Sequence, residues 1–242
     1  MLKLNYSLIS KLVQCPHRYE MEMVTKPEYT NVPLFLGSTF HLTIKMYHES
    51  RLANIELSED EVLQVFSDFW QRRTGARGQA IQWGKEKESN HQQMGLELIS
   101  AYYPYAKDCK PKIVEEKIVK EVMLDNGQVI VVDGIIDLIT DKKMIDYKTA
   151  GMMPFRSEVE RSIQSTIYLF LLGHIIPFEY HYVMKRKEPE VKIFSVEKTD
   201  YDLHFLEHRL FPYVVAMLNT GLFPPFGFVN ASCRWCPLDG KC

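Results

Sequence analysis

Two aspartates and a lysine lie close together in the middle of the sequence, as Asp137 and as the pair Asp146 and Lys148. Residues 128–140 and 144–148 have strand-like composition, and the segment 141–143 between them favours a turn. A hairpin of these strands would bring Asp137 beside Asp146, with Lys148 two residues further along the same face. The spacing is short and common, so an exposed, solvated face remains the alternative to a site.

If the two carboxylates do meet, the chemistry that they could perform is specific. Neighbouring carboxylates repel each other, and a divalent cation between them relieves that repulsion. Oxygen ligands of this kind favour Mg²⁺ or Mn²⁺ over zinc. The lysine could then position, or help to deprotonate, a water molecule that attacks phosphorus. The trio therefore indicates metal-dependent hydrolysis of a phosphodiester.

The cysteines point to a second inorganic group. Three of the five cysteines lie in the last ten residues as Cys233, Cys236 and Cys242, which is one thiolate short of a four-ligand site. Either Cys15 or Cys109 could supply the fourth thiolate. In a reducing compartment such grouped cysteines indicate metal rather than disulfides, and four thiolates suit zinc as well as an iron–sulfur cluster.

Length and composition set limits on the function. The chain has 242 residues, 46% of them hydrophobic, and a net charge of −2. This predicts a single domain over 1–242 without a global positive field, so DNA binding would need a local groove and bridging metal ions. No apolar run is long enough for a membrane span, and the N-terminus has no signal-peptide pattern. We therefore expect a soluble, cytoplasmic protein.

Hydrophobic periodicity predicts the elements that must position these residues. We expect helices first, then a strand meander, a helix, two more strands and a last helix. The predicted helices are 6–24 (with a break at Pro16), 37–52, the helix-rich segment 58–106 (with a loop around 74–79), 156–173 and 199–220. The predicted strands are 112–124, 128–140, 144–148, 179–185 and 191–196. This order predicts an α/β core with a mixed central sheet, flanked by helices and interrupted by a helical insertion. The expected parts are 1–36, an N-terminal helix, 37–110, the helical insertion, 111–197, the catalytic core, and 198–242, a C-terminal helix and cysteine tail.

Several short motifs resemble those of one nuclease family, and they occur in that family's order. Gly134-Ile-Ile-Asp137 followed by Ile145-Asp146-Tyr147-Lys148-Thr149 resembles motifs II and III of RecB-type nucleases in the PD-(D/E)XK superfamily. Gly37-Ser-Thr-Phe-His41 upstream and Gln164-Ser-Thr-Ile-Tyr168 downstream match two further motifs. Cys15-Pro-His-Arg-Tyr19 and the cysteine tail are similar to the iron–sulfur subset, which includes AddB-type nuclease domains and CRISPR-associated RecB-type exonucleases.

The resemblance implies a role for each matched residue. His41, Asp137, Asp146 and the main-chain carbonyl of Tyr147 would bind Mg²⁺ or Mn²⁺, and Lys148 would be the catalytic lysine. Gln164 and Tyr168 would line the site, and with Arg161 they would form a polar stripe on one helix. A 4Fe–4S cluster on Cys15, Cys233, Cys236 and Cys242 would join the two ends of a restriction-endonuclease-like fold, and Cys109 would be a free thiol.

The implied activity is that of a DNA exonuclease acting on single-stranded or frayed ends. The resemblance implies a prokaryotic or phage-encoded protein that acts in recombination, repair or CRISPR adaptation. A helicase or other proteins would be its partners, and it could form an oligomer. The alternative is a non-catalytic iron–sulfur protein that binds DNA or supports assembly. Four assignments stay open: whether Glu115 or Glu116 faces the metal, whether His48 belongs to the site, whether Tyr102, Tyr103 and Tyr105 stack on bases or fill the core, and whether zinc replaces iron.

Overall fold

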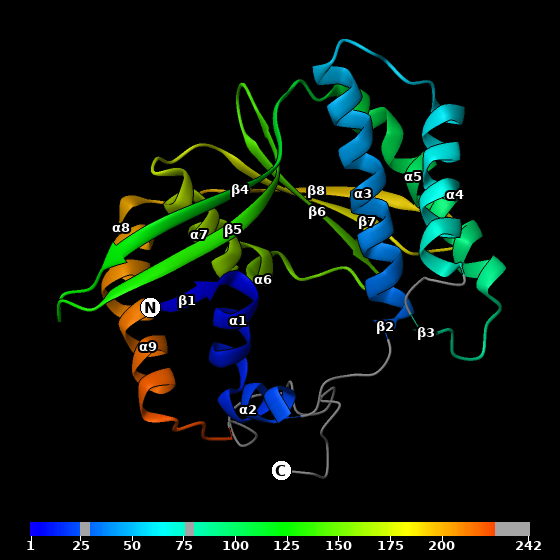
Figure 1. Ribbon diagram of the computed structural model, residues 1–242. Coiled ribbons are helices and arrows are strands. Elements are labelled where there is room, and N and C mark those ends of the chain that lie inside the picture. The colour runs from blue at the N-terminus through cyan, green and yellow to red at the C-terminus, as the bar shows by residue number, and fades with distance from the viewer. Residues whose placement is uncertain (25–29, 76–79, 226–242) are drawn as a thin grey trace.

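A mixed sheet forms the centre of the computed structural model, which describes residues 1–24, 30–75 and 80–225 (Figure 1). In the described part this sheet has six strands, β1 (Leu2–Asn5), β4 (Pro111–Met123), β5 (Val129–Thr140), β6 (Met144–Ala150), β7 (Phe178–Met184) and β8 (Glu190–Val196). β6 and β7 are parallel, whereas β4–β5, β5–β6 and β7–β8 are antiparallel. The predicted mixed sheet with flanking helices is confirmed.

Strand β5 lies between one strand on one edge and two strands on the other. β4 follows it along one edge, while β1 and β6 share the other edge. β1 pairs in parallel with residues 130–133 of β5, and β6 pairs only with Leu138 and Ile139. Residues 134–137 of β5 therefore border an opening between β1 and β6, which we call the β5–β6 fork.

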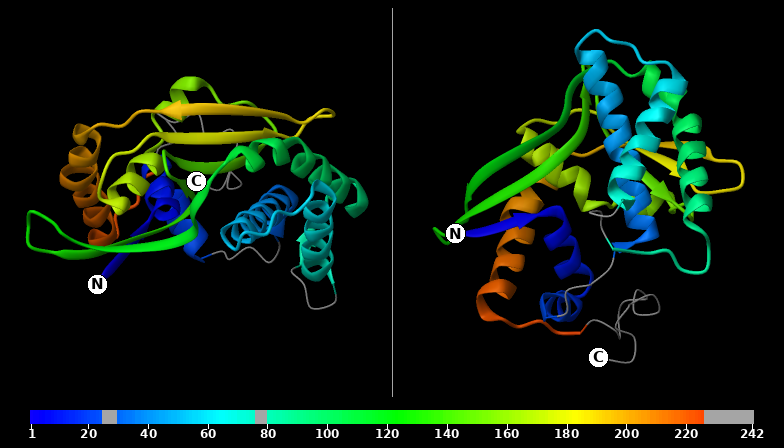
Figure 2. Two further views of the ribbon diagram at one scale, coloured as in Figure 1. Left: turned by 90° about the horizontal axis from the view of Figure 1, so that it is seen from above. Right: turned by 45° about the vertical axis from the view of Figure 1, so that its right-hand side comes forward.

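Helices cover the two faces of the sheet in separate groups (Figures 1 and 2). α3 (Val32–Leu52), α4 (Glu59–Thr74) and α5 (Glu88–Asp108) pack on one another around Phe66, Trp70 and Tyr102. The other group packs around Leu12, Ile167 and Phe211; it comprises α1 (Tyr6–Gln14), α7 (Ile163–Leu172), η1 (Leu206–Leu210) and α9 (Phe211–Thr220). None of the described helices is long and apolar enough to cross a membrane.

The remaining elements connect these groups. α2 (Pro16–Val24) follows α1 directly, and α6 (Arg156–Glu160) and α8 (Asp200–Phe205) precede α7 and η1. β2 (Thr30–Asn31) and β3 (Ile81–Gln82) form a short parallel pair at the start of α3. The expected break at Pro16 is confirmed, because α1 ends at Gln14 and Cys15 adopts extended backbone angles.

The structure corrects several predicted elements. α3 begins at Val32 rather than at residue 37. The predicted helix 156–173 is two helices, because Ser162 caps a new helix with its side chain accepting from the Gln164 amide. The predicted helix 199–220 contains a π-helical turn, η1. β1 was assigned to no element, since a strand of four residues is too short to show a clear period. Simple alternation along β5 would place Ile136 and Leu138 on the same face of the sheet. In the structure Ile136 packs in the core around Ile167, whereas Leu138 packs among α3–α5.

Gly134 lets α7 approach β5 closely. A Cβ atom at this position would lie 2.8 Å from Cδ1 of Leu171 and 3.1 Å from Cε1 of Tyr168. We therefore expect Gly134→Ala to lower the free energy of unfolding by about 1–3 kcal/mol through overpacking, measured by chemical denaturation. Gly151→Ala is the matched control, because nothing lies within 4 Å of its added Cβ. Equal stability of the two variants would contradict this packing.

Candidate active site

The two aspartates and the lysine meet in the β5–β6 fork. The register that pairs Leu138 with Ile145 continues to place Asp137 opposite Asp146, and the Tyr147 amide donates to Oδ2 of Asp137 at 3.0 Å. Asp146 is 2% exposed. Nζ of Lys148 lies 2.6 Å from its Oδ2. The structure thus brings these three side chains together as the hairpin argument predicts.

His41 reaches the same fork from α3. Its Nδ1 lies 3.4 Å from Oδ1 of Asp137. Gly37, one helical turn earlier on the same face, lies close to β6: a Cβ there would lie 3.1 Å from Oγ1 of Thr149. The spacing between Gly37 and His41 therefore has a physical reason, because the glycine lets the helix lie close enough for the imidazole to reach Asp137.

Glu115 completes an acidic group that the sequence left open. His41, Glu115 and Asp137 each offer a ligand atom, and these atoms lie within 4.8 Å of one another. The pairing of Val114 with Leu138 and of Glu116 with Ile136 places Glu115 opposite Asp137. Its φ of 45° is in the left-handed region, which costs a non-glycine residue energy and often marks a functional site. Lys45 forms an ion pair with this carboxylate at 3.1 Å.

The two aspartates have different proton affinities. Burial, together with the charge of Asp137, raises the pKa of Asp146 to about 6 against the opposing effect of Lys148. Burial favours a higher pKa for Asp137 as well, but this effect is outweighed. The net pKa of Asp137 is lowered by the charges of His41 and Lys148 and by the hydrogen bond from the Tyr147 amide. Burial acts to lower the pKa of His41, and the charge of Asp137 outweighs it and raises that pKa. The ionised form of Asp146 is therefore only weakly favoured at neutral pH, and a cation would stabilise it.

Gln164 and Tyr168 lie beneath these carboxylates, on α7. Nε2 of Gln164 donates to Oδ1 of Asp146 at 2.7 Å and to the Tyr168 hydroxyl at 3.1 Å. Both side chains are buried. The predicted polar stripe with Arg161 is wrong, because Arg161 lies at the end of α6, before α7 begins. Gln164 and Tyr168 instead hold Asp146 in place from below.

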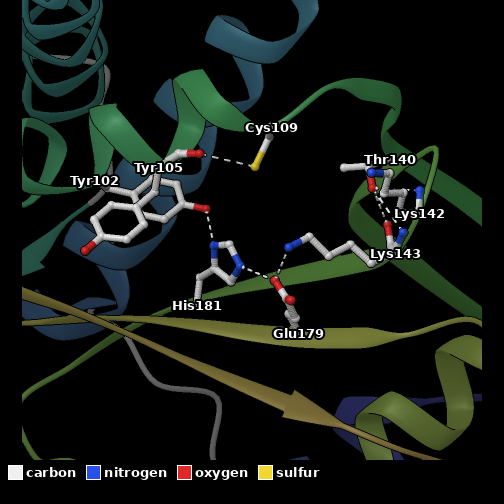
Figure 3. A network of polar contacts seen from close by, with 8 residues as sticks. All are labelled: Tyr102, Tyr105, Cys109, Thr140, Lys142, Lys143, Glu179 and His181. Atoms are coloured by element: carbon white, nitrogen blue, oxygen red, sulfur yellow. Dashed lines mark hydrogen bonds and ion pairs between the residues drawn. The ribbon is translucent and has the colours of Figure 1, made fainter.

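A polar chain fixes the base of β6 and β7 (Figure 3). The Tyr102 hydroxyl lies 2.7 Å from Nδ1 of His181, whose Nε2 lies 3.0 Å from Glu179, and Lys143 contacts the same carboxylate at 2.6 Å. Tyr102 and Tyr103 are buried, so these two tyrosines belong to the core rather than to a base-stacking surface. His48 is also buried, against Tyr147, and burial lowers its pKa to about 3. It does not join the acidic group.

The cysteines divide between described and undescribed parts of the chain. Cys15 lies between α1 and α2 and is partly exposed, whereas Cys109 is buried at the end of α5. Burial raises the pKa of Cys109 to about 11, which keeps it a thiol. Cys233, Cys236 and Cys242 lie outside the described residues, so the four-cysteine cluster stays a prediction.

A cavity of about 550 Å³ opens beside the fork and is lined on its inner side by His41, Glu115 and Lys148. Gly37, Leu34 and Thr149 contribute to its wall. A phosphodiester in this cavity would meet the acidic group and the lysine together. The carboxylates of Glu115 and Asp137 and the imidazole of His41 form a donor set that suits a hard divalent cation.

A solved structure of low sequence identity shares this fold. A predicted exonuclease from Eubacterium rectale superposes with a TM-score of 0.56 at 15% sequence identity, covering 96% of this chain and 87% of the other. The protein SSO0001 is similar with a TM-score of 0.48 at 14% identity, covering 100% of this chain and 86% of the other. Among curated proteins, no sequence matches the chain.

The family comparison covers almost the whole sequence. The model of the PD-(D/E)XK nuclease superfamily matches residues 3–242, a range that includes α3, the fork and α7. The match therefore spans every residue that the structure gathers around Asp137 and Asp146. This chain belongs to the PD-(D/E)XK nuclease superfamily.

Proposed function

We propose that the protein is a metal-dependent DNA exonuclease that hydrolyses phosphodiester bonds at single-stranded or frayed ends. Membership of the nuclease superfamily supports hydrolysis of nucleic acid. The observation that carries the proposal is the convergence of His41, Asp137, Asp146 and Lys148 in one fork. The likeness in fold to a predicted exonuclease agrees with it.

The donor set favours Mg²⁺ or Mn²⁺. His41, Asp137, Asp146 and the main-chain carbonyl of Tyr147 would hold the cation, with Glu115 as a further acidic ligand. When bound, such a cation activates water and stabilises negative charge on a phosphate. A site with this many carboxylate oxygens suits a hard cation better than zinc.

The protein's own groups would orient the reaction. Lys148 keeps its positive charge, because the neighbouring Asp146 carboxylate raises its pKa despite burial. It can therefore donate hydrogen bonds to an attacking water and to a phosphate oxygen. Gln164 holds the Asp146 carboxylate by its hydrogen bond, and this fixes the direction in which the other oxygen points.

The cysteine cluster belongs to the same proposal. Cys15, Cys233, Cys236 and Cys242 would bind a 4Fe–4S cluster that joins the N-terminal helices to the C-terminal tail. One described contact supports this connection: Tyr19 of α2 and Phe223, near the end of the described chain, have ring centroids 5.4 Å apart. Cys15 lies one helical turn before Tyr19, whose amide donates to the Cys15 carbonyl oxygen at 3.3 Å.

The cellular role proposed here is DNA recombination, repair or CRISPR adaptation. The 242 residues hold no phosphate-binding loop of the helicase type, so they supply no motor of that kind for unwinding DNA. A helicase or a CRISPR or recombination protein is therefore the expected kind of partner.

Removing the lysine should abolish cleavage. We expect Lys148→Ala to reduce hydrolysis of a labelled single-stranded oligonucleotide in Mg²⁺ or Mn²⁺ by at least about 100-fold, because the attacking water and the phosphate lose their cationic contact. Lys143→Ala is the matched control. Lys143 directly precedes β6, its side chain is as exposed as that of Lys148, and it also makes a 2.6 Å ion pair, with Glu179 of β7. Full activity in Lys148→Ala would contradict a catalytic role for this lysine, and absence of cleavage by the unaltered protein would favour the non-catalytic DNA-binding alternative.

Cation binding should depend on pH. Asp146 binds a proton with a pKa of about 6, and His41 has a raised pKa, so protons compete with the cation below that pH. We expect the affinity for Mn²⁺, measured by calorimetry, to fall by about tenfold or more per pH unit as the pH decreases from 6 to 5. Asp146→Asn should weaken binding and flatten this dependence. An affinity that is constant from pH 7 to 5 would speak against these ligands.

Iron content should distinguish the two described cysteines. We expect Cys15→Ala to lose bound iron and the visible absorption of the cluster, and Cys109→Ala to keep both, because Cys109 is a buried thiol. The measurement is metal analysis of protein purified without oxygen. Stoichiometric zinc without iron in the unaltered protein would rule out the iron–sulfur assignment.

A further inference from the structure

A second cavity lies on the other side of the catalytic lysine. It has a volume of about 330 Å³ and is lined by residues of α1 and α6 among others. Its floor includes Tyr182 of β7, which is directly opposite Lys148 in the β6–β7 register. Neighbouring strands are about 4.8 Å apart, so this cavity and the one beside His41 flank the same lysine.

The lining has the composition of a nucleoside site. Two tyrosines, Tyr6 and Tyr182, supply aromatic surface, and Arg161 lies at the rim. In the part of the chain that the structure describes, Arg161 forms no ion pair. The one carboxylate of the lining, Glu158, accepts a hydrogen bond from the Phe155 amide at 2.9 Å. The volume lies within the range of small-molecule sites, which begins at about 300 Å³.

We infer that this cavity, the α1–α6 cavity, receives the base of a nucleotide next to the scissile phosphate. The inference rests on the proposed function and adds to it a place for the substrate strand. With the phosphate beside Lys148, the adjoining base would lie against Tyr6 and Tyr182. Arg161 would contact that base or the phosphate that follows it.

This placement gives a physical reason for acting on single strands. A base can enter a cavity only when it is unpaired and unstacked from its neighbours, and a base within a duplex would first have to be extruded. Stacking on aromatic side chains recovers part of the free energy spent on unpairing and unstacking. Every base can make this contact, because each has a flat apolar face. The α1–α6 cavity therefore selects unpaired DNA without selecting a sequence.

The test combines altered DNA with altered protein. A series of single-stranded oligonucleotides, each with one abasic position, is titrated by fluorescence anisotropy in Ca²⁺, and the length of the DNA is checked afterwards. We expect one abasic position to weaken binding to the unaltered protein by about 5- to 100-fold. The doubly substituted protein Tyr6→Leu and Tyr182→Leu should bind intact DNA more weakly, and the same abasic position should have no further effect on it.

Two controls separate this inference from loss of the fold and from the proposed function. Arg161→Ala should weaken binding severalfold, whereas Arg156→Ala should not, because Arg156 lies on α6 in an ion pair with Glu160 and does not line the cavity. Thermal unfolding of each variant verifies folding. If no abasic position weakens binding, or if the tyrosine variant keeps the same sensitivity, the base is not in this cavity, while cleavage by the unaltered protein still establishes the nuclease.

Discussion

Two carboxylates held side by side in a buried fork repel each other, and the structure around Asp137 and Asp146 compensates for that repulsion. Lys148 lies against one carboxylate and His41 against the other. Even with these partners, the pKa of Asp146 stays raised to about 6. The negative charge of the pair is thus only partly compensated. A divalent cation would therefore bind more favourably here than at a fully neutralised pair.

The fork exists because β5 shares one edge between two strands. β1 ends its pairing at Asp133, and β6 begins its pairing at Leu138, so the backbone between them borders an open space. Two glycines bring helices to the two sides of this space: Gly37 lets α3 approach β6, and Gly134 lets α7 approach β5. His41 and Gln164 reach the carboxylates only because of these close approaches.

The two cavities lie on either side of the fork, where a substrate strand could reach both. The fork opens toward a cavity on the α3 side, and Tyr182 leads from Lys148 to the α1–α6 cavity on the other side. A single strand that occupied both would present one phosphate to the lysine. The polar chain of Tyr102, His181 and Glu179 connects α5 to β7.

The sequence by itself determined the mixed α/β class, the strands that carry Asp137, Asp146 and Lys148, and the break at Pro16, because turn residues, period-two alternation and proline geometry are local properties. Only the tertiary structure decided that Glu115 rather than Glu116 joins the acidic group, since this depends on a register and on a left-handed φ at Glu115. It also decided that Gln164 and Tyr168 are buried supports of Asp146, because their surroundings come from strands distant in the chain. A short pattern shows which side chains share a face, but the sequence contains no direct record of which distant element will cover that face.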